Sequence, residues 1–120
     1  MGEDTLFTEK DPFGNAITLS TDRYNQHIVQ ESGHTDVYPD DIKSTISSPA
    51  VIYQSSQRPS RNVYFAKTAG RPPFYTKVAA EIDESTKTGA VVTAFTTKKI
   101  AGGINEERGP LYIARDNKLR

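Results

Sequence analysis

The chain has 120 residues and a formal net charge of zero, with 35% hydrophobic and 25% charged residues, which predicts one soluble globular domain spanning residues 1–120. It has no cysteine, which excludes disulfides, and its two histidines lack the carboxylate cluster of a zinc site, so we expect no metal and no other cofactor. No apolar run reaches the ~18 residues of a membrane span, and the acidic N-terminus lacks the apolar core of a signal peptide.

Two short β-type runs flank a turn signal near the N-terminus. Thr5–Thr8 and Ala16–Leu19 are separated by a Pro-Phe-Gly-Asn sequence at Pro12–Asn15. This arrangement predicts a small hairpin or an extended lead-in to the domain.

A first helix is predicted over residues 22–32. Residues 20–21, a serine and a threonine, are candidate N-caps, and Gly33 is a natural stop. Arg23 and His27 are four residues apart, so on an α-helix their side chains would be neighbours.

A second helix is predicted to begin at Pro39 and to end before Pro49. Tyr38, Ile42 and Ile46 recur at helical spacing and predict a narrow apolar stripe facing the core.

The pattern then changes from helical to alternating. Residues rich in Val, Ile, Tyr, Phe and Thr predict four strands and a short edge strand, at 50–54, 62–67, 74–82, 90–97 and 111–114. Successive strands with short links usually form an antiparallel meander. The predicted fold class is therefore α+β, with N-terminal helices packed on one face of a four- to five-stranded antiparallel sheet.

Alternation along residues 89–97 predicts which side chains share a face. One face would carry Val91, Thr93, Phe95 and Thr97, and the other Val92, Ala94 and Thr96. The pattern leaves open which of the two faces the helices cover.

Charge is unevenly distributed along the chain. Residues 1–48 hold three Lys or Arg against nine acids, and residues 49–120 hold twelve against six. Residues 51–99 alone hold eight against three. The asymmetry is typical of an anionic partner for the second half, or of two solvated faces that attract each other within the fold.

The chain contains the residue types of a metal-independent ribonuclease. Such a reaction needs an acid and a base for the two oxygens, and cations or donors around the phosphate. The reference pKa of histidine lies near neutrality, so His27 is a candidate acid or base, and Arg23 and Arg61 are candidate phosphate cations. Thr93 is a candidate oxyanion donor, with Thr96 as the second choice.

Other side chains are candidates for substrate binding. Lys67 would add phosphate charge, and Phe95 or Tyr64 would stack on an unpaired base. His34 is interpreted as a loop histidine or a second acid/base. The alternatives are a partly buried helix histidine for His27 and a core position for Phe95.

Four segments carry a family resemblance: Ile17–Ile28 (an extended lead, then an aromatic residue and His-Ile), Ile42–Pro49, Arg61–Phe65 and Val91–Phe95. Over residues 13–100 their order resembles the phage-associated branch of the barnase/EndoU/colicin/RelE-like (BECR) nucleases. The match departs from the family pattern at two positions. Thr35 follows His34 where the family often has Pro, and Phe95 replaces a Tyr.

The resemblance implies a helical N-terminal half on a four-stranded antiparallel sheet, with a cleft on the open sheet face. It also implies an endoribonuclease toxin, often directed at tRNA, that leaves a 2′,3′-cyclic phosphate. Such domains occur in contact-dependent growth inhibition and phage-linked toxins, act in the cytoplasm of a target cell and are neutralised by an immunity protein. We expect a monomer that binds RNA.

Two other interpretations remain. The chain could be a non-catalytic RNA- or protein-binding module on the same fold. It could also be an immunity or antitoxin-type partner, which would present the acidic surface near residues 36–41 to a basic toxin.

Overall fold

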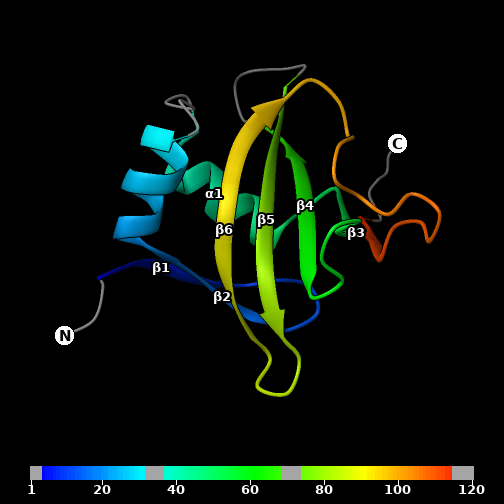
Figure 1. Cartoon of the computed structure of the whole chain (residues 1–120), viewed down its shortest axis with the longest axis horizontal. Helices are drawn as coiled ribbons and strands as arrows, with labels where there is room; N and C mark the ends of the chain where they lie inside the picture. The colour runs from blue at the N-terminus through cyan, green and yellow to red at the C-terminus, as the bar shows by residue number, and fades with distance from the viewer. Residues whose placement is uncertain (1–3, 32–36, 69–73, 115–120) are drawn as a thin grey trace.

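The structure is a computed structural model that describes residues 4–31, 37–68 and 74–114, excluding the side chains of residues 27 and 29–31. One seven-stranded sheet, in the order β1-β2-β6-β5-β4-β3-β7, dominates the described chain (Figure 1). The elements in chain order are β1 (Thr5–Lys10), β2 (Ala16–Ser20), η1 (Arg23–Glu31), α1 (Pro39–Ser47), β3 (Val51–Gln54), β4 (Arg61–Lys67), β5 (Tyr75–Asp83), β6 (Thr88–Thr97) and β7 (Tyr112–Ile113). No helix of the described ranges is long and apolar enough to cross a membrane.

The α+β class is confirmed, but the predicted sheet of four to five antiparallel strands is wrong in size and direction. The N-terminal hairpin joins the sheet because β2 pairs with β6, and that pair is parallel. The close approach depends on Gly89, which lies opposite Ile17; a Cβ at Gly89 would come within 2.8 Å of the Ile17 side chain. The partners are distant in the chain, so local patterns could not show the pairing.

The predicted hairpin is confirmed, and Asp11 organises its turn. Asp11 Oδ1 accepts the backbone N–H groups of Phe13 and Asn15, at 3.0 and 2.8 Å, and Oδ2 accepts the Asn15 side chain at 3.0 Å. Gly14 adopts φ +89°, in the left-handed region that glycine reaches at no steric cost. These short-range bonds explain why the turn signal was readable in the sequence.

The first helix begins as predicted, but it is not an α-helix. Ser20 Oγ accepts the N–H of Arg23 at 3.1 Å, which confirms the cap at residue 20. From Arg23 to Glu31 the helix is of the wider π type, whose hydrogen bonds span five residues. The predicted stop at Gly33 lies outside the described residues.

The second helix has the predicted limits. Pro39 begins α1, and the helix ends at Ser47, before Pro49. Ile42 and Ile46 are buried as predicted. Tyr38 is not part of that stripe: it is the N-cap residue and is 55% exposed, because its backbone is already extended.

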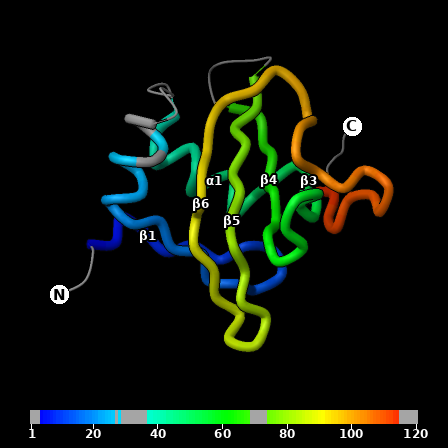
Figure 2. The backbone as a smooth tube through the Cα atoms, viewed as in Figure 1, coloured from blue at the N-terminus to red at the C-terminus, as the bar shows by residue number. Residues whose placement is uncertain are grey.

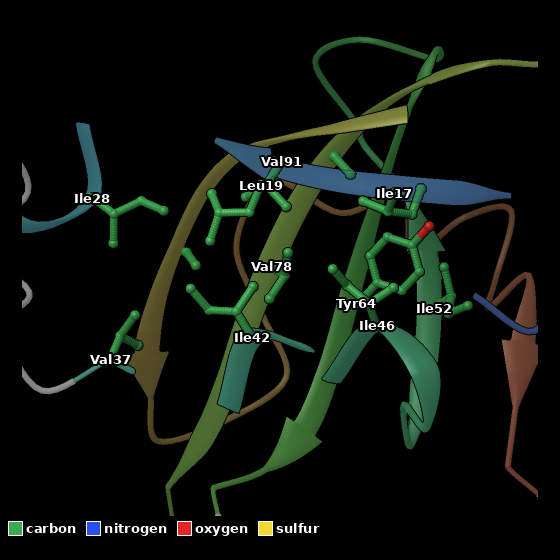
Figure 3. Close-up of a cluster of buried hydrophobic side chains, with 12 residues drawn as sticks. Ile17, Leu19, Ile28, Val37, Ile42, Ile46, Ile52, Tyr64, Val78 and Val91 are labelled. Carbon is green, nitrogen blue, oxygen red and sulfur yellow. The ribbon is translucent and has the colours of Figure 1, made fainter. Parts of the chain in front are cut away.

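The larger of the two hydrophobic clusters among the described residues lies between the sheet, α1 and η1 (Figure 3). Helix α1 lies against β1, β4 and β5, and η1 lies against β6 and β2. The buried side chains of this cluster are Ile17, Leu19, Ile28, Val37, Ile42, Ile46, Ile52, Tyr64, Val78, Ala80, Val91 and Ala94.

A β-bulge in β6 interrupts the predicted alternation, so the predicted placement of Val91 on the face of Thr93 is wrong. Thr93 lies opposite Ala79, but Val91 lies opposite Ala80, so one extra residue occupies β6 between them. Val91 therefore turns into the core, and only Thr93 and the residues after it follow the predicted pattern.

The opposite face of β3 and β4 is covered by the segment that follows β6. Ile100 and Ile104 pack there against Val51, Val63 and Phe65. Figure 2 shows this segment passing over the end of β5 and β4 toward β3. Within the described ranges, no helix covers the corresponding face of β5 and β6.

Tyr64 links the hairpin to β4, an interior strand of the sheet. Its side chain has no exposed surface, and its hydroxyl donates to Asp11 Oδ2 at 2.6 Å. Burial first, and then the hydrogen bond to Asp11, raise the pKa of Tyr64 far above its ordinary value. Tyr64 is therefore a neutral hydrogen-bond donor.

Replacing Tyr64 with Phe should lower the free energy of unfolding by about 1–3 kcal/mol, because it leaves a buried carboxylate with one donor fewer. Urea denaturation measures the change. The matched control is Tyr53→Phe in β3, whose hydroxyl has no hydrogen bond among the described residues and whose loss should cost less. Equal effects of the two substitutions would contradict the assigned role of the Asp11–Tyr64 bond.

Candidate functional site

The candidate site lies on the face of the sheet opposite α1, at the end of β4, β5 and β6 near residue 61. In Figure 1 this face is turned toward the viewer, and α1 and the hairpin lie behind it. The strand register places Arg61 beside Glu81, Glu81 beside Ala90, and Thr93 beside Ala79. We call these five residues the open face. Because Ala79 and Ala90 have small side chains, the surface is lower at these two positions than at the neighbouring polar residues.

Arg61 and Glu81 form an ion pair on the open face. Arg61 Nε lies 2.9 Å from Glu81 Oε1, and the Ser60 hydroxyl donates to Glu81 Oε2. Arg58 is a second cation near this carboxylate, with its Nε 4.0 Å from Glu81 Oε1. The hydrogen bonds from Ser60 and then Arg61 lower the pKa of Glu81, so it is a carboxylate at neutral pH.

Arg23 reaches the open face from η1. Its Nη1 donates to the carbonyl of Val92, within the β6 bulge, at 3.4 Å. Arg23 lines a pocket of about 560 Å³ at the point where β2 and β6 diverge after their last pair, Thr18 and Ala90. The full lining is Thr5, Thr18, Ser20, Asp22, Arg23, Gln26, Ala90 and Val91.

Ala90 connects this pocket to the Arg61–Glu81 pair. A second hollow, of about 540 Å³, is lined by Glu81 and Ala90 together with the residues of the β5–β6 end. Ala90 is exposed and lines both hollows. Arg23 and Arg61 therefore flank one continuous stretch of the sheet surface.

The two predicted threonine donors do not lie together. Thr93 is on the open face beside Ala79, whereas Thr96 lies beside Thr76, which is fully buried on the face that α1 covers. The opposite placement of the two threonines is the one that alternation predicts, because residues an odd number apart in a regular strand point to opposite faces. Thr96, the second choice as a donor, therefore does not join the open face.

Phe95 shares the face of Thr93 but lies under a cation. Lys77 Nζ is 5.1 Å from the centroid of the Phe95 ring and 5.8 Å from that of Phe65. It also donates to the carbonyls of Ala101 and Gly102, at 3.2 and 2.7 Å. Burial lowers the pKa of Lys77. This anchoring lysine was missed because its partners follow β6 in a segment without regular structure.

The remaining predicted residues fall into three groups. Tyr64 is buried in the core, so its predicted role in stacking on a base is wrong. Lys67 is exposed at the opposite end of β4 from Arg61, beside Tyr75, so it does not join the open face. His27 belongs to the same helix as Arg23, with its side chain outside the description, and His34 lies outside the described residues.

Glu81 is the residue of the open face that sequence reasoning overlooked. Its place in an alternating strand was readable, but its pairing with Arg61 depends on the register of β4 and β5. Within the described ranges, no group of three or more His, Asp or Glu side chains could hold a metal ion. No family model, no curated protein and no solved structure matches this chain.

Replacing Glu81 with Gln should reduce stability near neutral pH and have less effect in acid. The pKa of Glu81 is lowered in the folded state, so its contribution is present above the ordinary value of 4.5 and is lost as pH falls through the folded pKa. Unfolding free energies of both proteins between pH 3 and 7, measured in urea, test this.

The control for this comparison is Glu107→Gln, since Glu107 has no ion pair among the described residues. At neutral pH its unfolding free energy should differ less from that of the wild type than the unfolding free energy of Glu81→Gln does. A Glu81→Gln difference that does not change with pH would show that the ion pair with Arg61 does not form.

Proposed function

We propose that this chain is a metal-independent endoribonuclease toxin domain of the phage-associated BECR type, cleaving tRNA by acid/base transphosphorylation. The observation that carries the proposal is the open face itself. Arg61, Thr93 and Glu81 share a sheet surface that no helix of the described residues covers, and Arg23 reaches its edge from the helix that also contains His27.

The proposed reaction is attack of a ribose 2′-oxygen on the adjacent phosphorus. The P–O2′ bond forms, the P–O5′ bond breaks, and a 2′,3′-cyclic phosphate and a 5′-hydroxyl result. His27 is assigned the proton transfers to or from these oxygens, as base, acid or both. Arg23 and Arg61 would offset the phosphate charge, and Thr93 would donate to a phosphate oxygen.

The geometry of Arg61 supports its role. Glu81 accepts from Nε, which leaves the two Nη groups of the guanidinium without a partner among the described residues. Those groups provide two parallel donors, which match two oxygens of a phosphate. Glu81 is thereby a positioning residue, because it orients the guanidinium without needing to touch the RNA.

The proposed substrate is structured RNA bound by a local basic surface. The net charge of the chain is zero, so attraction must come from the cations near the open face rather than from the whole molecule. As a toxin domain, the chain would act as a monomer in the cytoplasm of a target cell and would be neutralised by an immunity protein.

The proposal predicts cleavage of total tRNA by the purified chain in EDTA, with discrete fragments on a denaturing gel. His27→Ala should reduce the rate by roughly 10²–10⁴-fold, the usual contribution of acid/base catalysis. Lys43→Ala on the exposed side of α1 is the control and should cleave like the wild type. End-group analysis of the fragments should find 2′,3′-cyclic phosphate.

Two results would overturn the proposal in different ways. A folded His27→Ala protein with unchanged activity would refute the site. Intact tRNA that nevertheless binds the wild-type chain would favour a non-catalytic RNA-binding module on the same fold.

The two threonines of β6 provide a matched test of the open face. Thr93→Val should reduce tRNA cleavage by at least about tenfold, because it removes a donor aimed at the substrate side of the sheet. Thr96→Val makes the same change on the opposite face and should leave the rate of the folded protein close to that of the wild type. Comparable losses in both variants would argue against the open face.

A further inference from the structure

A third pocket, of about 520 Å³, lies at the end of the sheet on the face opposite Arg61. It forms where the β1–β2, β3–β4 and β5–β6 turns meet the segment before β7. We call it the amide pocket; its lining is Phe13, Asn15, Gln54, Pro59, Ser60, Asn62, Ile82, Glu84, Lys87, Arg108 and Leu111. The volume is in the range of ordinary small-molecule sites, and none of the residues assigned to cleavage lines it.

Three side-chain amides line the amide pocket. Asn15 donates to the buried Asp11 carboxylate, and Gln54 donates to the carbonyl of Pro59 at 3.1 Å. Asn62 hydrogen-bonds the phenol of Tyr64. Each amide is thus held in place by at least one partner, and Gln54 by two, since its Oε1 also accepts from Arg108. Each still has donor or acceptor capacity for a ligand. Fixed groups of both kinds suit the edge of a nucleobase, which also presents donors and acceptors.

Apolar side chains provide the walls. Phe13, Ile82 and Leu111 line the pocket together with Pro59. Phe13 is 38% exposed, and its ring is fixed by an edge-to-face contact with Tyr112, with centroids 6.1 Å apart. An exposed but oriented aromatic ring is a stacking surface for a planar base.

Two cations line the same pocket. Lys87 Nζ donates to the carbonyl of Phe13 at 2.9 Å, and Arg108 Nη1 donates to Gln54 Oε1 at 3.1 Å. Glu84 is the acid in the lining, so the charge is +1. Lys87 has φ 56°, a conformation unusual for a residue with a side chain. The cations retain N–H groups that can bind an anion.

We propose that the amide pocket binds a nucleotide. The base would lie against Phe13 with its edge toward the amides, and the phosphate would contact Lys87 and Arg108. The nucleotide is either a free mononucleotide or one residue of a single strand. Ser60 lines the amide pocket, and its hydroxyl donates to Glu81 of the open face, so the two sites adjoin at Ser60. One nucleic-acid strand would therefore extend from the open face into the amide pocket.

Nuclear magnetic resonance of the whole chain tests the proposal directly. The side-chain amide signals of Asn15, Gln54 and Asn62 should shift when any of the four nucleoside 5′-monophosphates is added. Lys87→Gln and Arg108→Gln should each raise the dissociation constant about tenfold, the loss expected for one charged hydrogen bond. Lys43→Gln on α1 is the matched control and should bind like the wild type.

A 2′-O-methylated oligonucleotide, which lacks the 2′-hydroxyl needed for cleavage, distinguishes the two sources. Shifts with monophosphates indicate a free nucleotide, and shifts with the oligonucleotide alone indicate a strand. Inorganic phosphate that binds as tightly as the nucleotides would refute the base site. The base site would also be refuted if the three side-chain amide signals did not shift with any probe. Binding that is weakened by a change at Arg61 but not by a change at Lys87 would refute it as well. Because the readout is binding, none of these results decides whether the chain cleaves tRNA.

Discussion

The hydrogen bond between Tyr64 and Asp11 is the contact on which the arrangement of this domain depends. A two-stranded hairpin is marginal by itself, and here its turn is tied to the interior strand β4 by a buried phenol. The Asp11 carboxylate is almost fully buried, yet it accepts four hydrogen bonds, from two backbone N–H groups, the Asn15 amide and Tyr64. Because an unsatisfied buried carboxylate is costly, the turn, the strand and the carboxylate stabilise one another.

The position of the hairpin determines what the two faces of the sheet can do. With β2 parallel to β6 and α1 beside it, one face becomes the core and the opposite face of β5 and β6 stays uncovered by helices. The divergence of β2 from β6 also creates the pocket that Arg23 lines. Both the proposed cleavage site and the proposed nucleotide site therefore lie at boundaries set by this hairpin, on opposite faces of the sheet.

Features with local causes were predictable. The hairpin turn, the cap at Ser20 and the limits of α1 each depend on residues within a few positions of one another. The α+β class and the placement of Thr93 on a face with Phe95 follow from periodicity. The inward turn of Val91 was not predictable, because the bulge that causes it is a property of the β5–β6 pairing. Glu81 was overlooked as a partner of Arg61 because their contact depends on the register of β4 and β5.

The sequence by itself determined the α+β class, the hairpin and helix signals, and the absence of any cysteine-based chemistry. Its patterns could not assign Tyr64, since an aromatic residue in a strand suits a core and a binding face equally well. Tertiary structure decided that Tyr64 supports the core, that Thr93 lies on the face away from α1, and that Arg61 is oriented by Glu81. These outcomes depend on strand register and on contacts between distant segments, which only the folded chain brings together.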